Sequence, residues 1–475
     1  MKIRLIEPKS TRWNVYSHVK LMRLGLPIIG AALNQSGHDV RIYVEELGPI
    51  DWDDVYSSDL VGLSCITATA PQTYKYSDMI RKRGIPTIIG GVHATFCTEE
   101  ALNHSNYVAK GESGELLMLE LINVMNGNGK LEEIPGLAYW ENGYQHVNTM
   151  RSRPKDLDSL PYPDLDLIVN NERIATKPFI TSLGCPEDCD FCSVKIMFGQ
   201  RYRCRSIENV VSELKQKKPD KVFFYDDNFG ASKVRLRRLL ERIIEEDLKF
   251  SWSAQVEVSI ALKQKRMTNL DTGKQELITQ GPDKELLELM QKSGCWLVYM
   301  GLESVSDETL KAYNKSQNVR DIEKSVGYLN YYGIGTHGMF VVGADTDNQD
   351  VVKATVKFAQ KHHLYSIMLN ILTPLPGTPF YDRMKAAGRI IDENWEHYDA
   401  HHVVFRPRNL TPYELQREVI KGYSRFYAVR HLPEALIRLK RVKSKLLLRI
   451  MGYMIVRSWK RDARNSVYID TLKTV

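Results

Sequence analysis

Short runs of apolar residues alternate with segments of helical periodicity over the first 125 residues of the chain. Runs of four to eight apolar residues between turn residues predict buried strands, and apolar positions spaced by three or four predict helices. The predicted strands lie at 2–6, 40–45, 59–66, 87–90 and 107–110. The predicted helices lie at 27–36, 74–82 and 99–103, with another that begins near Gly114. Buried strands that alternate with helices indicate a doubly wound parallel sheet.

A second region of alternating strands and helices begins near Phe179. Its predicted strands lie at 179–182, 221–225, 250–255, 296–301, 335–342 and 366–372, with helices such as 209–216 and 283–293 between them. This repetition predicts a partial barrel of six strands and six helices or a second open sheet. Before it, a hairpin pattern around Asn142–Gly143 is followed by a proline-rich linker.

The predicted fold class is therefore α/β, with a doubly wound parallel sheet first and a partial barrel or a second open sheet after it. The expected units are a first domain at 1–133, a hairpin and linker at 134–172, a second domain at 173–385 and a helical region at 386–475.

Composition narrows the class of protein further. Hydrophobic residues make up 43% of the chain and charged residues 26%, which is typical of a globular protein. No run of eighteen apolar residues occurs and no apolar signal core is visible, so a cytoplasmic protein is expected. Three of the seven cysteines lie within eight residues, which argues against a disulfide framework and for a metal centre.

The net charge of +7 is concentrated near the C-terminal end. Residues 431–464 hold ten Lys or Arg and two acidic residues, so the rest of the chain is close to neutral and no nucleic-acid partner is expected. Apolar residues recur at 436, 439, 442, 446, 450 and 454, with basic residues between them. Such a helix either lies on an anionic membrane, binds a negatively charged substrate, or packs its apolar stripe on the domain beneath it.

Cys185, Cys189 and Cys192 form a C-x3-C-x2-C motif directly after a predicted strand. Three thiolates on one loop suit an iron–sulfur cluster or zinc. Structural zinc sites take four ligands, commonly from paired C-x2-C motifs, and no second pair occurs in the chain. Three ligands leave one iron of a four-iron cluster open to another ligand. A non-catalytic metal-binding scaffold is the alternative outside the enzymes.

This motif, with Phe191 before its last cysteine, resembles the signature of the radical S-adenosylmethionine (SAM) enzymes. Further segments follow in that family's order, namely RYRCRSIENVVSEL (201–214), YDDNF (225–229), MGLESVSDETL (300–310), GMFVVGADTDN (338–348) and LTPLPGTPFYD (372–382). The resemblance implies a [4Fe–4S] cluster held by the three cysteines. It also implies a SAM site formed by Phe191, Asp226, Asp227, Gln255, Glu303 and Gly343. Asp226 or Asp227 would receive the SAM ammonium group, and Glu303 the ribose hydroxyls.

The first domain resembles the cobalamin-binding domain that precedes the radical SAM barrel in one branch of the family. Residues 64–96 and 108–115 carry this resemblance, but the Asp-x-His-x-x-Gly cobalt ligand of other cobalamin domains is absent. Cobalamin would therefore bind without a protein ligand to cobalt, or the domain would keep the fold without the cofactor. The implied cobalamin contacts are Ser64, Thr67, Gly90, Gly91, His93 and Glu112.

These resemblances imply an enzyme that generates a 5′-deoxyadenosyl radical from SAM. Methylation of an unactivated carbon is the expected reaction. A cyclisation like that of the anaerobic magnesium-protoporphyrin cyclase, a rearrangement, or an oxidoreduction with or without cobalamin are the alternatives. The expected partners are a small-molecule or lipid-like substrate and an external one-electron reductant such as flavodoxin or ferredoxin. The basic tail adds an anionic membrane surface as a further partner, which would make a cytoplasmic enzyme peripheral to the membrane.

Overall fold

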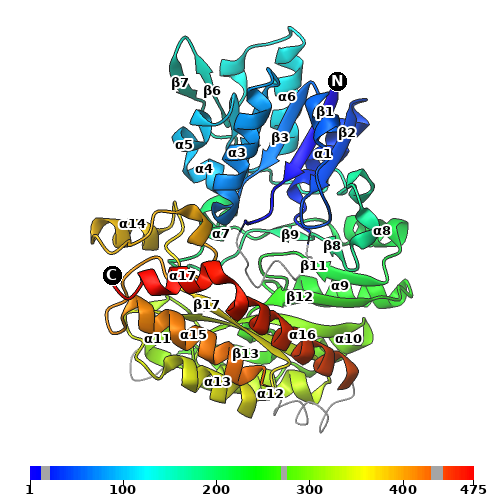
Figure 1. The fold of residues 1–475 in the computed structure, drawn as a ribbon. Helices are drawn as coiled ribbons and strands as arrows, with labels where there is room; N and C mark the ends of the chain where they lie inside the picture. Colours follow the sequence, from blue (N-terminus) through cyan, green and yellow to red (C-terminus); the bar gives the residue numbers. More distant parts are fainter. Residues whose placement is uncertain (12–21, 269–274, 429–441) are drawn as a thin grey trace.

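The computed structural model describes residues 1–11, 22–268, 275–428 and 442–475. The chain forms two α/β domains and a helical C-terminal region, with the first domain above the second in Figure 1. The apolar helix segments within these ranges are too short or too polar to span a membrane.

The first domain contains the five parallel strands that the sequence predicts. They are β1 (Lys2–Glu7), β2 (Asp39–Val44), β3 (Leu60–Ser64), β4 (Thr87–Gly90) and β5 (Tyr107–Ala109), in the order β2-β1-β3-β4-β5. The helices are α1 (Gly25–Gln35), α2 (Trp52–Tyr56), α3 (Ala70–Arg81), α4 (Val92–Phe96), α5 (Thr98–Asn103) and α6 (Gly114–Met125). Helices α1 and α6 pack together on the sheet, and α3 packs on β3 and β4. The doubly wound prediction is confirmed.

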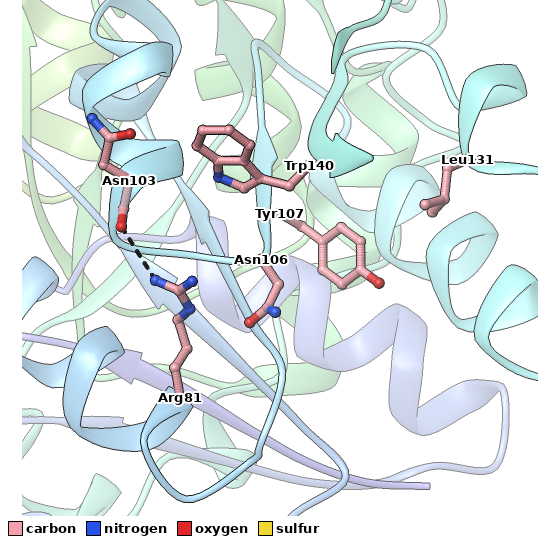
Figure 2. Close-up of a pocket in the computed structure, with 6 residues that line it drawn as sticks. All are labelled: Arg81, Asn103, Asn106, Tyr107, Leu131 and Trp140. Atoms are coloured by element: carbon pink, nitrogen blue, oxygen red, sulfur yellow. Dashed lines mark hydrogen bonds between the residues drawn. The ribbon is translucent and has the colours of Figure 1, made fainter. Parts of the chain in front are cut away.

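The predicted hairpin forms, but it extends the first sheet instead of lying in a separate segment. Its strands are β6 (Leu137–Glu141) and β7 (Tyr144–Val147), and β6 runs antiparallel to β5. The side chains of Leu137, Ala138 and Tyr139 are buried, because β6 covers the edge that β5 would otherwise expose. A polar pocket of about 310 Å³ opens beside this hairpin (Figure 2). It lies at the amino end of β5, opposite the edge where parallel sheets bind ligands.

The second domain is built on a parallel sheet of six strands. They are β8 (Lys177–Phe179), β11 (Lys221–Phe224), β12 (Ser251–Val256), β15 (Cys295–Glu303), β16 (Gly335–Val342) and β17 (Ser366–Ile371), and they follow one another in sequence order across the sheet. The edge strands β8 and β17 do not pair, so the sheet is a partial barrel. The predicted strand at 179–182 divides, because β8 ends at Phe179 and a short β9 (Ser182–Leu183) pairs with β10 (Arg203–Cys204).

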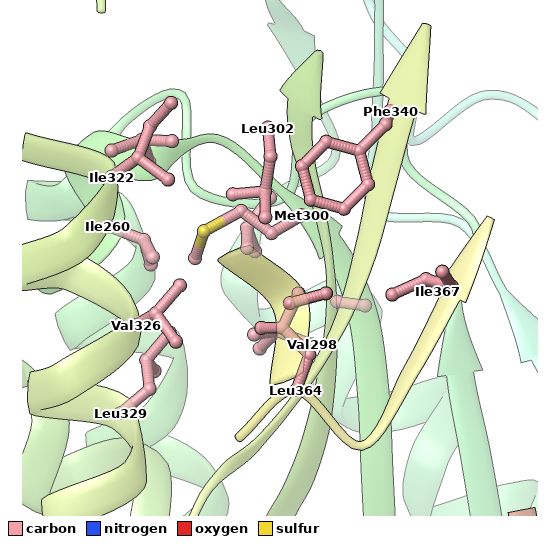
Figure 3. Packing of buried hydrophobic residues seen from close by; sticks show 14 of the residues in the cluster. Ile260, Val298, Met300, Leu302, Ile322, Val326, Leu329, Phe340, Leu364 and Ile367 are labelled. Carbon is pink, nitrogen blue, oxygen red and sulfur yellow. The ribbon is translucent and has the colours of Figure 1, made fainter. Parts of the chain in front are cut away.

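Helices cover the outside of this sheet. They are α8 (Ile207–Lys217), α9 (Lys233–Glu245), α10 (Lys284–Lys292), α11 (Asp307–Ala312), α12 (Val319–Tyr331) and α13 (Val351–Lys361), and a short α7 (Val194–Phe198) follows the cysteines. Figure 3 shows how α12 packs, with Ile322, Val326 and Leu329 directed at Val298 and Met300 of β15. A hairpin of β13 (Leu262–Thr268) and β14 (Gln275–Pro282), which the sequence pattern does not predict, follows β12.

The C-terminal region is helical, as predicted. It contains α14 (Pro379–Ala386), α15 (Pro412–Phe426), α16 (Val442–Arg461) and α17 (Ala463–Thr471). Part of the predicted basic helix, including Leu436 and Leu439 of the apolar stripe, lies outside the described residues. In the described part, Ile450 and Met454 of the stripe are exposed, so these residues do not pack on the domain beneath.

Candidate active site

The carboxyl ends of the strands in the two sheets meet at the interface between the domains. Glu112, which follows β5, accepts a hydrogen bond of 2.8 Å from Nη2 of Arg203 in β10. Gly377, which follows β17, lies so close to α4 that a Cβ there would stand 2.5 Å from the ring of Phe96. Parallel sheets bind ligands beyond the carboxyl ends of their strands. The predicted site residues therefore gather between the two domains.

The cysteine loop follows β9 and turns sharply at Gly184. The φ angle of Gly184 is +86°, and a Cβ there would lie 2.6 Å from the carbonyl oxygen of Arg201, so only glycine fits. Burial raises the pKa of Cys185 to about 11 and that of Cys189 to about 12, and it also raises the pKa of Cys192. Thiols in such surroundings release their protons when a metal binds.

The three thiols of the cysteine loop bear on the choice between the two metal centres that the sequence leaves open. Zinc–sulfur bonds of about 2.3 Å place neighbouring sulfur ligands about 4 Å apart. In the part of the chain that the structure describes, three potential ligand atoms lie within 4.8 Å of one another only at His93, Cys97 and Glu100. The three sulfur atoms of the cysteine loop therefore do not all lie within 4.8 Å of one another. Three thiols without a second C-x2-C pair fit a polynuclear iron–sulfur cluster better than a zinc site of four ligands.

Two segments from elsewhere in the chain hold the cysteine loop from outside. Nδ2 of Asn314 donates a hydrogen bond of 3.0 Å to the carbonyl oxygen of Asp188. The amide of Phe380, in α14, donates one of 3.2 Å to the carbonyl oxygen of Asp190, whose carboxylate also pairs with Arg383. None of these contacts uses a cysteine sulfur, so the position of the loop does not depend on the thiols alone.

The structure assigns different environments to the two adjacent aspartates that follow β11. The carboxylate of Asp226 is fully buried and accepts hydrogen bonds from the Thr181 amide at 2.7 Å, the Thr181 hydroxyl at 2.6 Å and the Ser182 hydroxyl. It therefore ties β11 to the start of the cysteine loop and does not face a ligand. Asp227 is half-buried and accepts one hydrogen bond of 3.1 Å, from the Gly184 amide. Burial raises the pKa of Asp227 to about 6.

Glu303 ends β15 in the left-handed region, with φ +57°, and pairs with Lys315 at 3.1 Å. Burial lowers the pKa of Lys315, but the charges of Glu303, Cys189 and Glu187, together with the hydrogen bond to Glu303, outweigh burial and raise the net pKa. The charges of Lys315, Asp227 and Glu303 all act on the thiol of Cys192, so these groups surround the cysteine loop. Lys315 was not predicted, because a lysine twelve residues after Glu303 in a short turn carries no sequence signal.

The other predicted SAM residues lie in three different settings. Phe191 packs edge to face on Tyr313, with ring centroids 5.2 Å apart. Gln255 is half-buried near the end of β12. Gly343 has φ +102°, and a Cβ there would lie 2.8 Å from Leu415 of α15. A side chain added at Gly343 would therefore meet a side chain of the C-terminal region.

The predicted cobalamin residues follow β3 and β4. Ser64 is half-buried at the end of β3, and Thr67 is buried at the start of the short helical turn that follows. The Cys65 amide donates a hydrogen bond of 2.7 Å to the carbonyl oxygen of Gly90. A Cβ on Gly91 would lie 2.6 Å from the carbonyl oxygen of Cys65, so this glycine is required by contact with the chain itself.

His93 is buried at the start of α4, with its ring edge on Trp395 and the ring centroids 5.1 Å apart. Its Nε2 lies 3.8 Å from the carboxylate of Glu100, which accepts a hydrogen bond of 2.9 Å from the Trp395 indole. Oε1 of Glu112 pairs with Arg203 and with Arg153 and so joins the two domains, while Oε2 of the same carboxylate has no partner.

Several buried polar atoms at this interface have no hydrogen-bond partner. Among them are Nη1 of Arg23, Nδ1 of His93 and Oε2 of Glu112. Buried polar atoms are almost always paired, and those that are not commonly contact a ligand or water. The interface therefore offers unpaired polar atoms to a ligand or to water.

Comparison with known families agrees with both halves of this arrangement. Residues 179–359 match the radical SAM superfamily, and residues 17–119 match the B12 binding domain. The chain is a B12-binding radical SAM enzyme. The two domains imply a [4Fe–4S] cluster, SAM and cobalamin as its cofactors. The three thiols of the cysteine loop fit the cluster, and the unpaired polar atoms between the domains fit cobalamin.

Relatives of the enzyme share its length. It is 29% identical over 437 residues to bacteriochlorophyllide d C-12(1)-methyltransferase of Chlorobaculum tepidum, covering 88% of this chain and 87% of the relative. It is 27% identical over 423 residues to an uncharacterized methyltransferase of Pyrococcus horikoshii, covering 85% and 87%. The structure of the radical SAM methyltransferase TsrM from Kitasatospora setae has the same fold, with a TM-score of 0.68, 15% identity, and 97% of this chain and all of that chain covered.

Proposed function

We propose that this enzyme transfers a methyl group from SAM to an unactivated carbon of a small or lipid-like molecule. The observation that carries the proposal is the arrangement of the cysteine loop of a radical SAM domain against the carboxyl edge of a B12-binding domain, joined by the Glu112–Arg203 pair. The relatives named as methyltransferases support it, including one named for a chlorophyll-type substrate.

Each group between the domains has a role in this proposal. Together, the bound cofactors supply one-electron cleavage of SAM to a 5′-deoxyadenosyl radical and delivery of a methyl group. Cys185, Cys189 and Cys192 would hold the cluster. Asp227 would accept a hydrogen bond from the SAM ammonium group, and Lys315 would pair with the SAM carboxylate. Glu303 would orient Lys315 and accept a hydrogen bond from the ribose.

The same proposal implies a one-electron reductant as a partner and the cytoplasm as the location of the enzyme. A radical SAM enzyme needs a one-electron reductant, and a flavodoxin or ferredoxin in the cytoplasm would supply it. Cyclisation, rearrangement or oxidoreduction by the same radical is the second candidate, which uses the same SAM site and differs in the fate of the methyl group.

The products formed from SAM distinguish these reactions. Enzyme reconstituted without oxygen and incubated with hydroxocobalamin and a chemical reductant is expected to release both 5′-deoxyadenosine and S-adenosylhomocysteine, measured by mass spectrometry. Release of 5′-deoxyadenosine alone would favour a cyclase, rearrangement or oxidoreduction. Release of neither, with zinc in place of iron, would contradict the enzyme proposal.

Asparagine in place of Asp226 or Asp227 is expected to have opposite effects. Asp226→Asn can keep an oxygen toward the Thr181 amide, but its NH2 group then faces the Thr181 and Ser182 hydroxyls in place of a carboxylate oxygen, which is expected to cost about 2 kcal/mol of stability. Asp227→Asn keeps the oxygen that faces Gly184 and removes a carboxylate whose pKa of about 6 makes its charge unfavourable at pH 7, so stability is expected to be equal or higher. The same change is expected to weaken SAM binding about tenfold. Thermal unfolding measures the stability of each variant, and equilibrium dialysis with SAM measures its affinity for SAM. Equal effects of the two variants would contradict a structural role for Asp226 and a binding role for Asp227.

A further inference from the structure

Helix α16 buries the basic side chains of Lys445 and Arg449 and exposes the apolar side chains of Leu447, Ile450 and Met454. Its inner face carries Lys445, Arg449, Gly452, Val456 and Trp459, all buried. The guanidinium of Arg449 donates to the carbonyl oxygens of Phe426 at 2.6 Å and Leu364 at 3.1 Å, and it lies 3.6 Å from the centroid of the Phe426 ring. Phe426 is the last residue of α15, and Leu364 lies just before β17. Arg449 therefore donates to two backbone carbonyl groups that would otherwise be buried without a donor.

The outer face of α16 follows from this anchoring. Leu447, Ile450 and Met454 are 58%, 39% and 56% exposed and lie on one side of the helix, at spacings of three and four. Arg457 and Arg461 continue the same line and are exposed. Neither pairs with a carboxylate in the ranges that the structure describes. Figure 1 shows α16, drawn in red, on the outside of the second domain. This outer face is apolar in its first half and cationic in its second.

A basic hollow lies beside the cationic half of this face. It has a volume of about 410 Å³, and three of its lining residues, Lys421, Arg425 and Lys460, carry positive charge. Lys421 and Arg425 share a single acidic partner, Glu418, which leaves an excess of positive charge in the hollow. Lys460 extends from α16 toward α15. An anionic headgroup is the natural occupant of such a site beside an exposed apolar face.

We propose that the outer face of α16 is a membrane-docking surface, with Leu447, Ile450 and Met454 inserted among acyl chains and Arg457, Lys460 and Arg461 on anionic headgroups. Charge complementarity selects this occupant, since a face bounded by cations matches a negatively charged bilayer. The inference does not depend on the reaction that the enzyme catalyses. It implies that the substrate is reached at the membrane surface.

Full-length enzyme is expected to sediment with vesicles of phosphatidylglycerol and phosphatidylcholine and not with vesicles of phosphatidylcholine alone. Each Lys or Arg near an anionic surface strengthens binding about fivefold, so the triple variant R457Q/K460Q/R461Q is expected to bind about 100-fold more weakly. Raising the salt concentration from 0.1 M to 1 M shortens the screening length from about 10 Å to about 3 Å and is expected to release the wild type. The variant L447Q/I450Q/M454Q is expected to lose binding without a change in thermal unfolding, because these side chains are exposed.

Matched controls keep the test specific. The variant Y144Q/V234Q/Y331Q removes three exposed apolar side chains elsewhere, and K130Q/K249Q/K353Q removes three exposed cations elsewhere. Both are expected to bind vesicles as the wild type does. Equal losses in the controls, or a wild type that stays in the supernatant, would overturn the proposal. A wild type that ignores vesicles but forms dimers that L447Q/I450Q/M454Q dissociates, seen by light scattering, would assign the face to a second copy instead. SAM cleavage measured in parallel separates this outcome from failure of the proposed reaction.

Discussion

Alanine in place of Cys185, Cys189 and Cys192 together is expected to abolish iron binding and SAM cleavage. The three thiols are the ligands of the proposed cluster, and alanine offers no donor to iron. Reconstituted wild type is expected to hold about four iron atoms per chain, and the triple variant none. Iron content and 5′-deoxyadenosine released from SAM measure the two effects.

The fold is expected to survive this change. Contacts from Asn314, Phe380 and Arg383 hold the backbone and acidic side chains of the cysteine loop without the sulfur atoms. Far-ultraviolet circular dichroism and retention of hydroxocobalamin by the first domain are therefore expected to match the wild type.

Cys204→Ala is the matched control. Cys204 lies in β10, which pairs with the strand just before the loop, but it is outside the C-x3-C-x2-C motif. This variant is expected to keep the iron and the activity of the wild type. A triple variant that still cleaves SAM, or a Cys204→Ala variant that loses its iron, would show that the cluster ligands have been assigned wrongly.

The strands of the two parallel sheets could be predicted because each is a local pattern, and so could the helices α1, α3, α5, α6, α8 and α10. The second half of β16 is the apolar run Met339–Val342, and the predicted bounds of this strand, 335–342, are those observed. The hairpin at β6 and β7 was also predicted, but its partner was not. The strand that a hairpin pairs with depends on which sheet edge is open once the other strands are in place. The residues of the hairpin do not indicate which edge that is.

The residues of the site could be predicted where a motif fixes the spacing of the ligands. The prediction was incomplete where the role of a residue depends on the direction of its side chain. Asp226 and Asp227 are equivalent in the sequence, but one carboxylate turns into Thr181 and the other toward the cysteine loop. Lys315 reaches Glu303 only because the turn after α11 folds back over the loop. Periodicity likewise predicted the apolar stripe of α16, but it did not predict which face of the helix packs on the domain. The packed face contains Arg449, whose carbonyl acceptors lie in segments far away in the sequence.

Alanine at Gly91 and alanine at Gly90 are expected to separate a backbone requirement from a ligand contact. The backbone of Gly91 has φ +112° and ψ −179°, a region that essentially only glycine occupies. A Cβ there would also lie 2.6 Å from the carbonyl oxygen and 3.1 Å from the amide nitrogen of Cys65. At Gly90, a Cβ would meet only Ala109, at an ordinary contact distance of 3.5 Å.

Gly91→Ala is therefore expected to cost about 3 kcal/mol and to lower the unfolding midpoint of the first domain by roughly 10 °C. The strain displaces the start of α4, which carries His93 toward the domain interface, so hydroxocobalamin is expected to be lost during gel filtration. Gly90→Ala is expected to have the unfolding midpoint of the wild type and to retain hydroxocobalamin, because the added methyl group touches one small side chain. The second domain has its own core, so iron content is expected to stay unchanged in both variants. If Gly90→Ala loses hydroxocobalamin while its unfolding midpoint is unchanged, Gly90 contacts the ligand directly. If Gly91→Ala keeps both the unfolding midpoint and the hydroxocobalamin of the wild type, the close approach to Cys65 is not what requires glycine at this position.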